Sequence, residues 1–310
     1  MSAIALPRRT GPRHGERPGP RIAARTSAGW PQVDYTRFSI RPLNTTIGAE
    51  VEGISLAEPL GDEAHAQLHA ALLEWKVLFF RGQHLTGPQH EAIGASWGEL
   101  ETNPILAALG SRVDDLAKVV RFEKGENVGG QENLWHSDVS WRVSPSLGSI
   151  LRAVEVPAAG GDTLFADMGA AYDCLEDELK AAIDGRSAVH DWWSAFSGVM
   201  SREDRDALRP NLPSVEHPIV RTHPETGRKT LYVNAAFTEH IVGLDPDVSE
   251  TLLDILFRQA SYPEYQCRWK WTAGDVAFWD NRATQHYASS DYHPQRRVME
   301  RVTIAGDRPY

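Results

Sequence analysis

The chain has 310 residues, 41% of them hydrophobic and 24% charged, which is an ordinary globular composition with enough length for a sizeable core. A net charge of −10 and a pI near 5.6 argue against nucleic acid or an anionic membrane as the main partner, because both would repel it. A small-molecule partner is therefore the default expectation. No apolar run approaches the ~20 residues of a membrane span.

The composition changes near residue 33. Residues 1–33 are rich in Arg, Pro and Gly and show no helical or strand period, which predicts a disordered tail. Residues 34–310 have the composition of a folded protein without a long linker or repeat, so we expect a single domain there. The two cysteines, Cys174 and Cys267, lie far apart, which excludes a disulfide framework and favours the reducing cytosol.

Hydrophobic periodicity and turn residues predict many short strands with a few helices. The strands are expected at 38–43, 49–56, 77–83, 149–156, 160–167, 217–222, 230–234, 265–271, 275–281 and 296–306. The helices are expected at 62–76, 88–100, 168–183 and 249–260. This pattern predicts a mainly β protein with flanking helices (α+β), and it favours a double-stranded β-helix, or jelly roll, over a parallel α/β sheet.

The stretch "WHSDVSWR" (135–142) places a histidine and an aspartate two residues apart in an aromatic setting. In extended chain, His136 and Asp138 would point to the same side and could converge on a metal ion. A buried ion pair or a hydrogen-bonded core histidine would explain the same spacing, so the hypothesis needs a third ligand. His286, which follows the apolar segment "GDVAFWDNRATQ", is the candidate.

Two histidines and one carboxylate form a facial set that leaves three positions of an octahedral iron(II) open. Zinc prefers a closed tetrahedral site or one open position. The three residues alone do not choose between these metals.

A pair of arginines follows shortly after His286. In "RRVMERVTI", Arg297 and Arg301 share one strand face because a strand has a period of two. Arginine suits bidentate binding of a carboxylate and keeps its charge. The pair could lie on a solvated face, but its place after a candidate ligand favours an inward orientation, and inward guanidinium groups need bound anions.

These segments together resemble a known family, the iron(II)- and 2-oxoglutarate-dependent dioxygenases of the taurine dioxygenase and 2,4-dichlorophenoxyacetate dioxygenase type. The resemblance runs from about Phe38 to the C-terminus. It is densest in four blocks that occur in the family's order and spacing: "NLWHSDVSW", "GGDTLFAD", "HPIVRTHPETGRKTLYVN" and "GDVAFWDNRATQHYASSDYHPQRRVMERVTIAGDRP".

The resemblance implies roles for individual residues. His136, Asp138 and His286 match the iron ligands, while Arg297 and Thr163 match the residues that bind the distal carboxylate of 2-oxoglutarate. The positions that match the primary substrate's pocket are Arg301, which would hold an anionic group, Asn103, Leu106, Glu132, Phe237 and Trp279, with Trp192 or Phe196 from a less clearly aligned segment.

Three pocket positions differ from the taurine enzyme. Asn103, Leu106 and Glu132 stand where that enzyme has histidine, tyrosine and asparagine, so taurine is not the expected best substrate. Leu106 suggests a larger or more apolar substrate body. Glu132 would either meet an amine or face solvent.

The implied activity uses iron(II), 2-oxoglutarate and O2 to hydroxylate, and in some cases thereby cleave, a small organic anion such as a sulfonate, sulfate ester or carboxylate, with release of succinate and CO2. The residues leave two alternatives open: a zinc hydrolase on the same triad, and a non-catalytic jelly roll that binds a small molecule. Family members commonly form dimers or tetramers, so a homo-oligomer is compatible with the resemblance.

Overall fold

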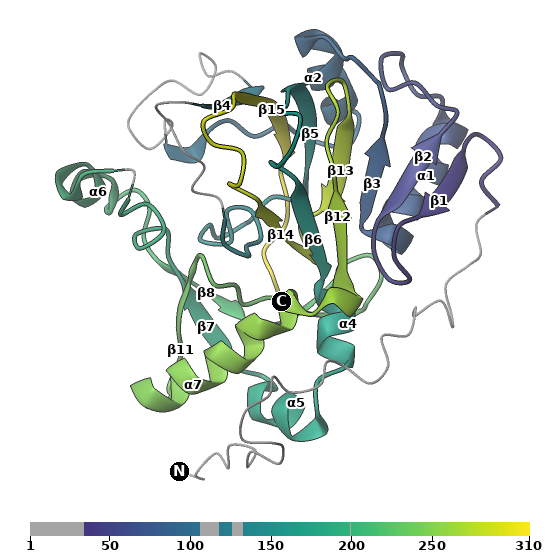
Figure 1. Ribbon diagram of the computed structural model, residues 1–310. Coiled ribbons are helices and arrows are strands. Elements are labelled where there is room, and N and C mark those ends of the chain that lie inside the picture. The colour runs from purple at the N-terminus through teal and green to yellow at the C-terminus, as the bar shows by residue number, and fades with distance from the viewer. Residues whose placement is uncertain (1–33, 106–117, 126–132, 199) are drawn as a thin grey trace.

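The computed structural model describes residues 34–105, 118–125, 133–198 and 200–310, and the predicted tail, 1–33, lies outside them. Within the described ranges the protein is mainly β, with helices at the flanks and ends of the sheets (Figure 1). The expected class, mainly β with flanking helices, is confirmed. None of the helices described is both long and apolar enough to cross a bilayer.

The largest sheet has seven strands, and all neighbours are antiparallel except the parallel pair β2–β3. Its strands, in spatial order, are β1 (Ser39–Pro42), β2 (Ala49–Glu52), β3 (Val77–Phe80), β13 (Val276–Asp280), β5 (Gly148–Glu155), β15 (Arg297–Ile304) and β4 (Val120–Lys124).

Three smaller sheets complete the described strands. Their strands, in spatial order, are β12 (Gln266–Trp269), β6 (Thr163–Asp167) and β14 (Thr284–Ala288); β11 (Thr238–Ile241), β7 (Ser187–His190) and β8 (Val215–Pro218); and β10 (Lys229–Leu231) with β9 (Val220–Thr222). The sheet β12-β6-β14 faces the large sheet and closes the jelly roll.

The helices are α1 (Asp62–Trp75), α2 (Gly87–Ala95), α4 (Met168–Asp173), α5 (Asp177–Ile183), α6 (Arg202–Leu208) and α7 (Pro246–Phe257), with 3-10 turns η2 (Arg258–Ser261) and η3 (Pro263–Tyr265). Three helices, α1, α2 and α7, lie where the sequence predicts them, and α6 was not predicted. The single helix predicted at 168–183 is wrong: Glu176 has an extended backbone (φ −60°, ψ 145°), which separates α4 from α5.

Strand alternation builds the core on both faces of the large sheet. On β13, Val276 and Phe278 pack in the cluster that includes α1 and α2, while Ala277 and Trp279 pack against Phe165 of β6 and its neighbours. Because β13 is apolar on both faces, every residue of the strand is buried. The space between the two sheets is therefore lined by the alternate residues of β13, β15 and β6.

Buried histidines make stability depend on pH. His90 on α2 is fully buried, with Nε2 2.9 Å from the carbonyl oxygen of Ile150. Burial, aided by the charge of Arg152, lowers its pKa to about 4, so it is neutral in the folded protein at neutral pH. In the unfolded chain a histidine takes up its proton near pH 6.5, so this stabilisation is complete above that pH and is lost as the pH falls toward 4.

We predict that His90→Gln, whose amide can still donate to Ile150, makes the free energy of unfolding fall less steeply between pH 6.5 and 4. The slope should decrease by up to about 1.4 kcal/mol per pH unit. Urea unfolding at a series of pH values measures it, with the exposed His240→Gln on β11 as the control for the substitution. An unchanged slope in His90→Gln would contradict the assignment.

Candidate active site

The three predicted ligands converge. One ligand atom from each of His136, Asp138 and His286 lies within 4.8 Å of the other two. The Nε2 atoms of His136 and His286 lie 4.0 Å and 3.9 Å from Oδ1 of Asp138. His286 is on β14, and its ring faces Trp279 and Phe165. The cluster therefore lies at the inner side of the small sheet β12-β6-β14.

The chain reaches this geometry by a different route from the one predicted. Residues 135–142 do not form a strand: His136 makes an isolated antiparallel bridge with His286, through N–H···O distances of 3.1 and 2.8 Å. The chain then turns, with Val139 at a φ of 46°. The expectation that the period of a strand aligns His136 with Asp138 is therefore wrong, because a bridge and a turn bring them together.

The histidine nitrogens suit metal binding. Nδ1 of His136 donates to the carbonyl oxygen of Leu134 at 2.8 Å, which leaves Nε2 to face Asp138. A ligand histidine is commonly oriented by such a second hydrogen bond. Nδ1 of His286 is buried and makes no hydrogen bond. Two imidazole nitrogens and one carboxylate oxygen fit iron(II), and the same donors can also hold zinc.

Electrostatics keep two of these ligands deprotonated. Burial opposes ionisation of Asp138, but Arg301 and the two histidines outweigh it and lower the carboxyl pKa to about 2. Burial lowers the pKa of His286 to about 3, with further lowering by His136. Metal binding requires a charged carboxylate and a neutral imidazole, and both forms predominate here at neutral pH.

The arginine pair points inward. Arg301 donates to Oδ1 of Asp138 at 2.8 Å, and Ser149 donates to the other carboxylate oxygen at 3.1 Å. Arg297, two positions before Met299 of the inter-sheet core, is 8% exposed, and its guanidinium lies 5.8 Å from the ring centroid of Tyr292. The alternative of a solvated strand face is wrong.

A glycine makes room for Arg297. Gly161 has a φ of +70°, and a Cβ added there would lie 3.1 Å from Cδ of Arg297. Its neighbour on β6, Thr163, is buried, and its hydroxyl accepts a hydrogen bond from Nε1 of Trp271 at 2.9 Å. Neither Gly161 nor Trp271 was predicted as a site residue, although the "GG" before "DTLF" indicates a special backbone position.

The aromatic pocket residues occupy two layers. The ring centroid of Trp279 lies 5.0 Å from that of His286, and the ring centroid of Phe237 lies 6.0 Å from that of His136. Both aromatic rings therefore border the triad. Trp192 is fully buried in a cluster with Trp141 and donates to the carbonyl oxygen of Leu212 at 2.8 Å. Trp192 therefore lies in the core behind the predicted substrate pocket and does not line its surface.

The other predicted pocket positions are less informative. Phe196 is half-buried against Trp192, with ring centroids 6.1 Å apart. Asn103 is half-buried, and its Oδ1 accepts from the amide of Ile105 at 3.0 Å, so it organises its own turn. Leu106 and Glu132 lie outside the described residues.

Removing the cation beside Asp138 should destabilise the metal-free protein. The pKa of about 2 means that ionised Asp138 stabilises the fold above about pH 4, and that this contribution is lost as the pH falls toward 2. We predict that Arg301→Gln lowers the free energy of unfolding by about 2–3 kcal/mol at pH 7 and flattens the decline between pH 4 and 2.

Urea unfolding in the presence of a chelator measures this effect. Arg121→Gln, which removes an exposed ion pair with Glu300, is the control and should cost no more than about 1 kcal/mol. Equal losses in the two variants would show that Arg301 does not compensate the buried charge.

Comparison with known proteins gives a consistent result. Residues 39–303 match the family described as "Taurine catabolism dioxygenase TauD, TfdA family". An alkylsulfatase from Acinetobacter baylyi is 37% identical over 87% of this chain and 86% of its own length. An (S)-phenoxypropionate/alpha-ketoglutarate-dioxygenase from Sphingobium herbicidovorans is 36% identical over 87% of this chain and 96% of its own.

A solved structure agrees with these relatives. The crystal structure of a taurine dioxygenase from Burkholderia xenovorans is 38% identical and superimposes with a TM-score of 0.74, covering 88% of this chain and 92% of that one. The matched range includes His136, Asp138, His286 and the two inward arginines. The chain belongs to the TauD/TfdA family of dioxygenases.

Proposed function

We propose that this protein is an iron(II)- and 2-oxoglutarate-dependent dioxygenase that hydroxylates a small organic anion, and that residues 34–310 form its single catalytic domain. The observation that carries the proposal is the joint placement of His136, Asp138 and His286 beside two inward arginines, Arg297 and Arg301. The triad alone fits a zinc hydrolase equally well. Arg297 adds a buried guanidinium on the same face of β15 as Arg301, which suits binding of an anionic co-substrate.

In this proposal His136, Asp138 and His286 hold the iron. Iron(II) bound there would supply the activation of O2 that is coupled to conversion of 2-oxoglutarate to succinate and CO2. The protein's contribution is to bind, orient and shield the reactants. The guanidinium groups of Arg297 and Arg301, together with bound iron(II), would attract a dianionic co-substrate and an anionic substrate.

Each reactant has its own residues. Arg297 would bind the distal carboxylate of 2-oxoglutarate, and its burial would strengthen that ion pair because little water competes. Thr163 would donate its hydroxyl proton to the same carboxylate. Arg301 would hold the anionic group of the primary substrate, which orients one C–H bond toward the metal. Trp279 and Phe237 would exclude water from the reacting centre.

The substrate class follows from the charge of Arg301 and from its apolar surroundings. Arg301 lies 5.0 Å from the ring centroid of Phe122, and aromatic rings border the triad on other sides. We infer an anion with an apolar body: a sulfate ester, a larger sulfonate or an aryloxy carboxylate. The names of the alkylsulfatase and phenoxypropionate relatives support this class. We place the enzyme in the reducing cytosol, since Cys174 and Cys267 form no disulfide.

Binding of 2-oxoglutarate to Arg297 can be tested directly. Anaerobic addition of 2-oxoglutarate to the iron(II)-loaded protein should produce a weak visible charge-transfer band. We predict that Arg297→Gln requires about 100-fold more 2-oxoglutarate to reach half of the full band, because the buried ion pair with the distal carboxylate is lost.

The neighbouring arginine offers a matched control. Arg296 is exposed and pairs with Glu123 and Glu155, so Arg296→Gln should bind 2-oxoglutarate as the wild type does. An equal requirement in both variants would remove Arg297 from the co-substrate site. A folded, iron-loaded wild type without any band would favour the hydrolase or the non-catalytic binding protein.

The proposed substrate class can be tested by measuring succinate release. Succinate release should be faster with alkyl sulfates and aryloxy carboxylates than with taurine, while uncharged analogues of the same shape should not stimulate it. In Arg301→Gln, KM for the anionic substrates should rise by about 10- to 100-fold. Taurine as the best substrate, or equal stimulation by uncharged analogues, would contradict the proposed substrate class.

A further inference from the structure

The turn between β13 and β14 carries a buried asparagine that contacts the main chain of a metal ligand. Asn281 is fully buried, and its Oδ1 accepts a hydrogen bond from the backbone amide of Asp138 at 2.7 Å. Its Nδ2 donates to the carbonyl oxygens of Asp138 at 3.0 Å and of Ser146 at 3.1 Å. One side chain therefore holds both backbone polar groups of the ligand residue.

The turn that carries Asn281 is itself fixed by a buried ion network. Oδ1 of Asp280 accepts from the backbone amide and Nε of Arg282, both at 2.9 Å, and Oδ2 accepts from Nη2 of Arg282 at 2.7 Å and Nε2 of His223 at 2.9 Å. Burial opposes ionisation of Asp280, but Arg282 and His223 hold its pKa well below the usual range. A second ion pair joins Arg282 to Glu225 at 2.7 Å.

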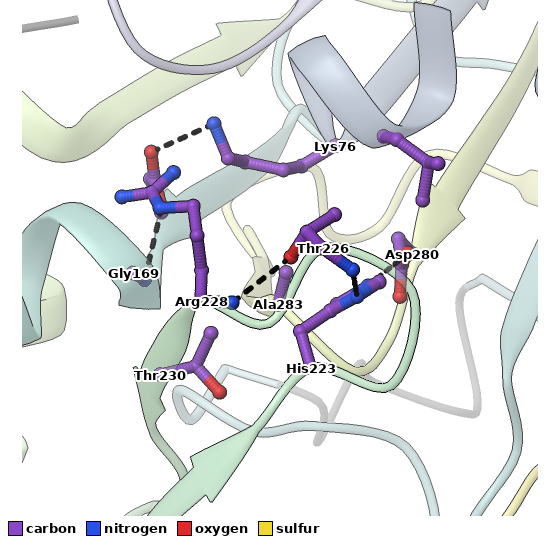
Figure 2. A pocket seen from close by; sticks show the side chains of 10 residues that line it. Lys76, Gly169, His223, Thr226, Arg228, Thr230, Asp280 and Ala283 are labelled. Carbon is purple, nitrogen blue, oxygen red and sulfur yellow. Dashed lines mark hydrogen bonds and ion pairs between the residues drawn. The ribbon is translucent and has the colours of Figure 1, made fainter. Parts of the chain in front are cut away.

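Figure 2 shows the pocket behind this turn, where His223 and Asp280 lie beside Thr226, with Lys76 on another element. Lys76 lies 3.1 Å from Asp167, and Arg228 pairs with Asp173 at 2.7 Å. The backbone amide of Asp280 donates to the carbonyl oxygen of Lys76 at 2.8 Å. We therefore infer that these ion pairs and hydrogen bonds hold the turn in place.

The ligand segment is attached at three consecutive residues to β14 and to the turn that precedes it. His136 exchanges backbone hydrogen bonds with His286, and Ser137 donates its hydroxyl proton to the carbonyl oxygen of Thr284 at 2.9 Å. Asp138 is the third, through Asn281. Of these three attachments, only the contact with Asn281 holds a metal ligand, Asp138, through a side chain that is not a metal ligand itself. Asn281 can therefore be replaced without changing the ligand set.

We propose that Asn281 is a positioning residue that sets the distance between the carboxylate of Asp138 and the two ligand histidines. Asparagine is suited to this role because its amide carries an acceptor and a donor side by side. Aspartate has no donor at neutral pH, and glutamine is one methylene longer. The inference rests on the proposed function, in which the triad holds a metal.

The test compares metal affinity with stability. In Asn281→Asp the carboxylate keeps the shape but faces two carbonyl oxygens, and in Asn281→Ser the shorter hydroxyl reaches fewer partners without added charge. We expect cobalt(II), titrated into the metal-free full-length protein against a chelator, to bind about 10- to 100-fold more weakly to both variants. The visible spectrum of bound cobalt(II) should change as well.

Asn44→Asp is the matched control. Asn44 is half-buried and also holds one backbone amide, that of Thr46 at 3.1 Å, and one carbonyl oxygen, that of Gln266 at 2.8 Å. It should lose stability without losing cobalt(II) affinity. If both Asn281 variants bind cobalt(II) as Asn44→Asp does, with an unchanged spectrum, the positioning role is overturned.

A separate variant distinguishes failure of the metal site from failure of this inference. His286→Ala should reduce cobalt(II) binding more than either Asn281 variant. If His286→Ala and the wild type bind cobalt(II) equally, the triad does not hold the metal, and the proposed function fails with the inference. If His286→Ala is impaired and both Asn281 variants are not, the inference alone fails.

Discussion

A charged carboxylate in the interior is the constraint on which the site depends. An ionised aspartate is stable away from water only when cations and hydrogen-bond donors surround it. For Asp138 these come from Arg301 on β15 and Ser149 on β5, while Asn281 holds its main chain. The charge of the Asp138 carboxylate is therefore compensated only when β5 and β15 pair in register. The fold and the electrostatics of the site depend on each other for this reason.

Two-sheet closure explains why reactive groups from distant parts of the chain meet. The ligand histidine of β14 comes from the small sheet, whereas Arg297 and Arg301 come from the inner face of the large one. Between them lie the rings of Trp279 and Phe165, which keep the space apolar. The left-handed backbone of Gly161 makes room for Arg297 at the edge of this space. Anions entering it meet cations with little competing water.

Regular strands were the part that the sequence could predict. The period of two placed Arg297 and Arg301 on one inner face because β15 is a long, uninterrupted strand. The period of two does not apply at 135–142, where a bridge to β14 and the turn at Val139 replace the strand. The strands β4, β7, β11 and β14 were not predicted, since all four are short and carry polar residues. Asn281 was missed because its bonds join residues far apart in sequence and leave no local pattern.

The most direct test of the account is a crystal structure of the protein with manganese(II) and an unreactive analogue of 2-oxoglutarate. We predict that the metal binds to Nε2 of His136, a carboxylate oxygen of Asp138 and Nε2 of His286. The distal carboxylate of the analogue should bind Arg297, which leaves Arg301 to the substrate. Metal bound away from the triad, or the distal carboxylate on Arg301, would contradict the account.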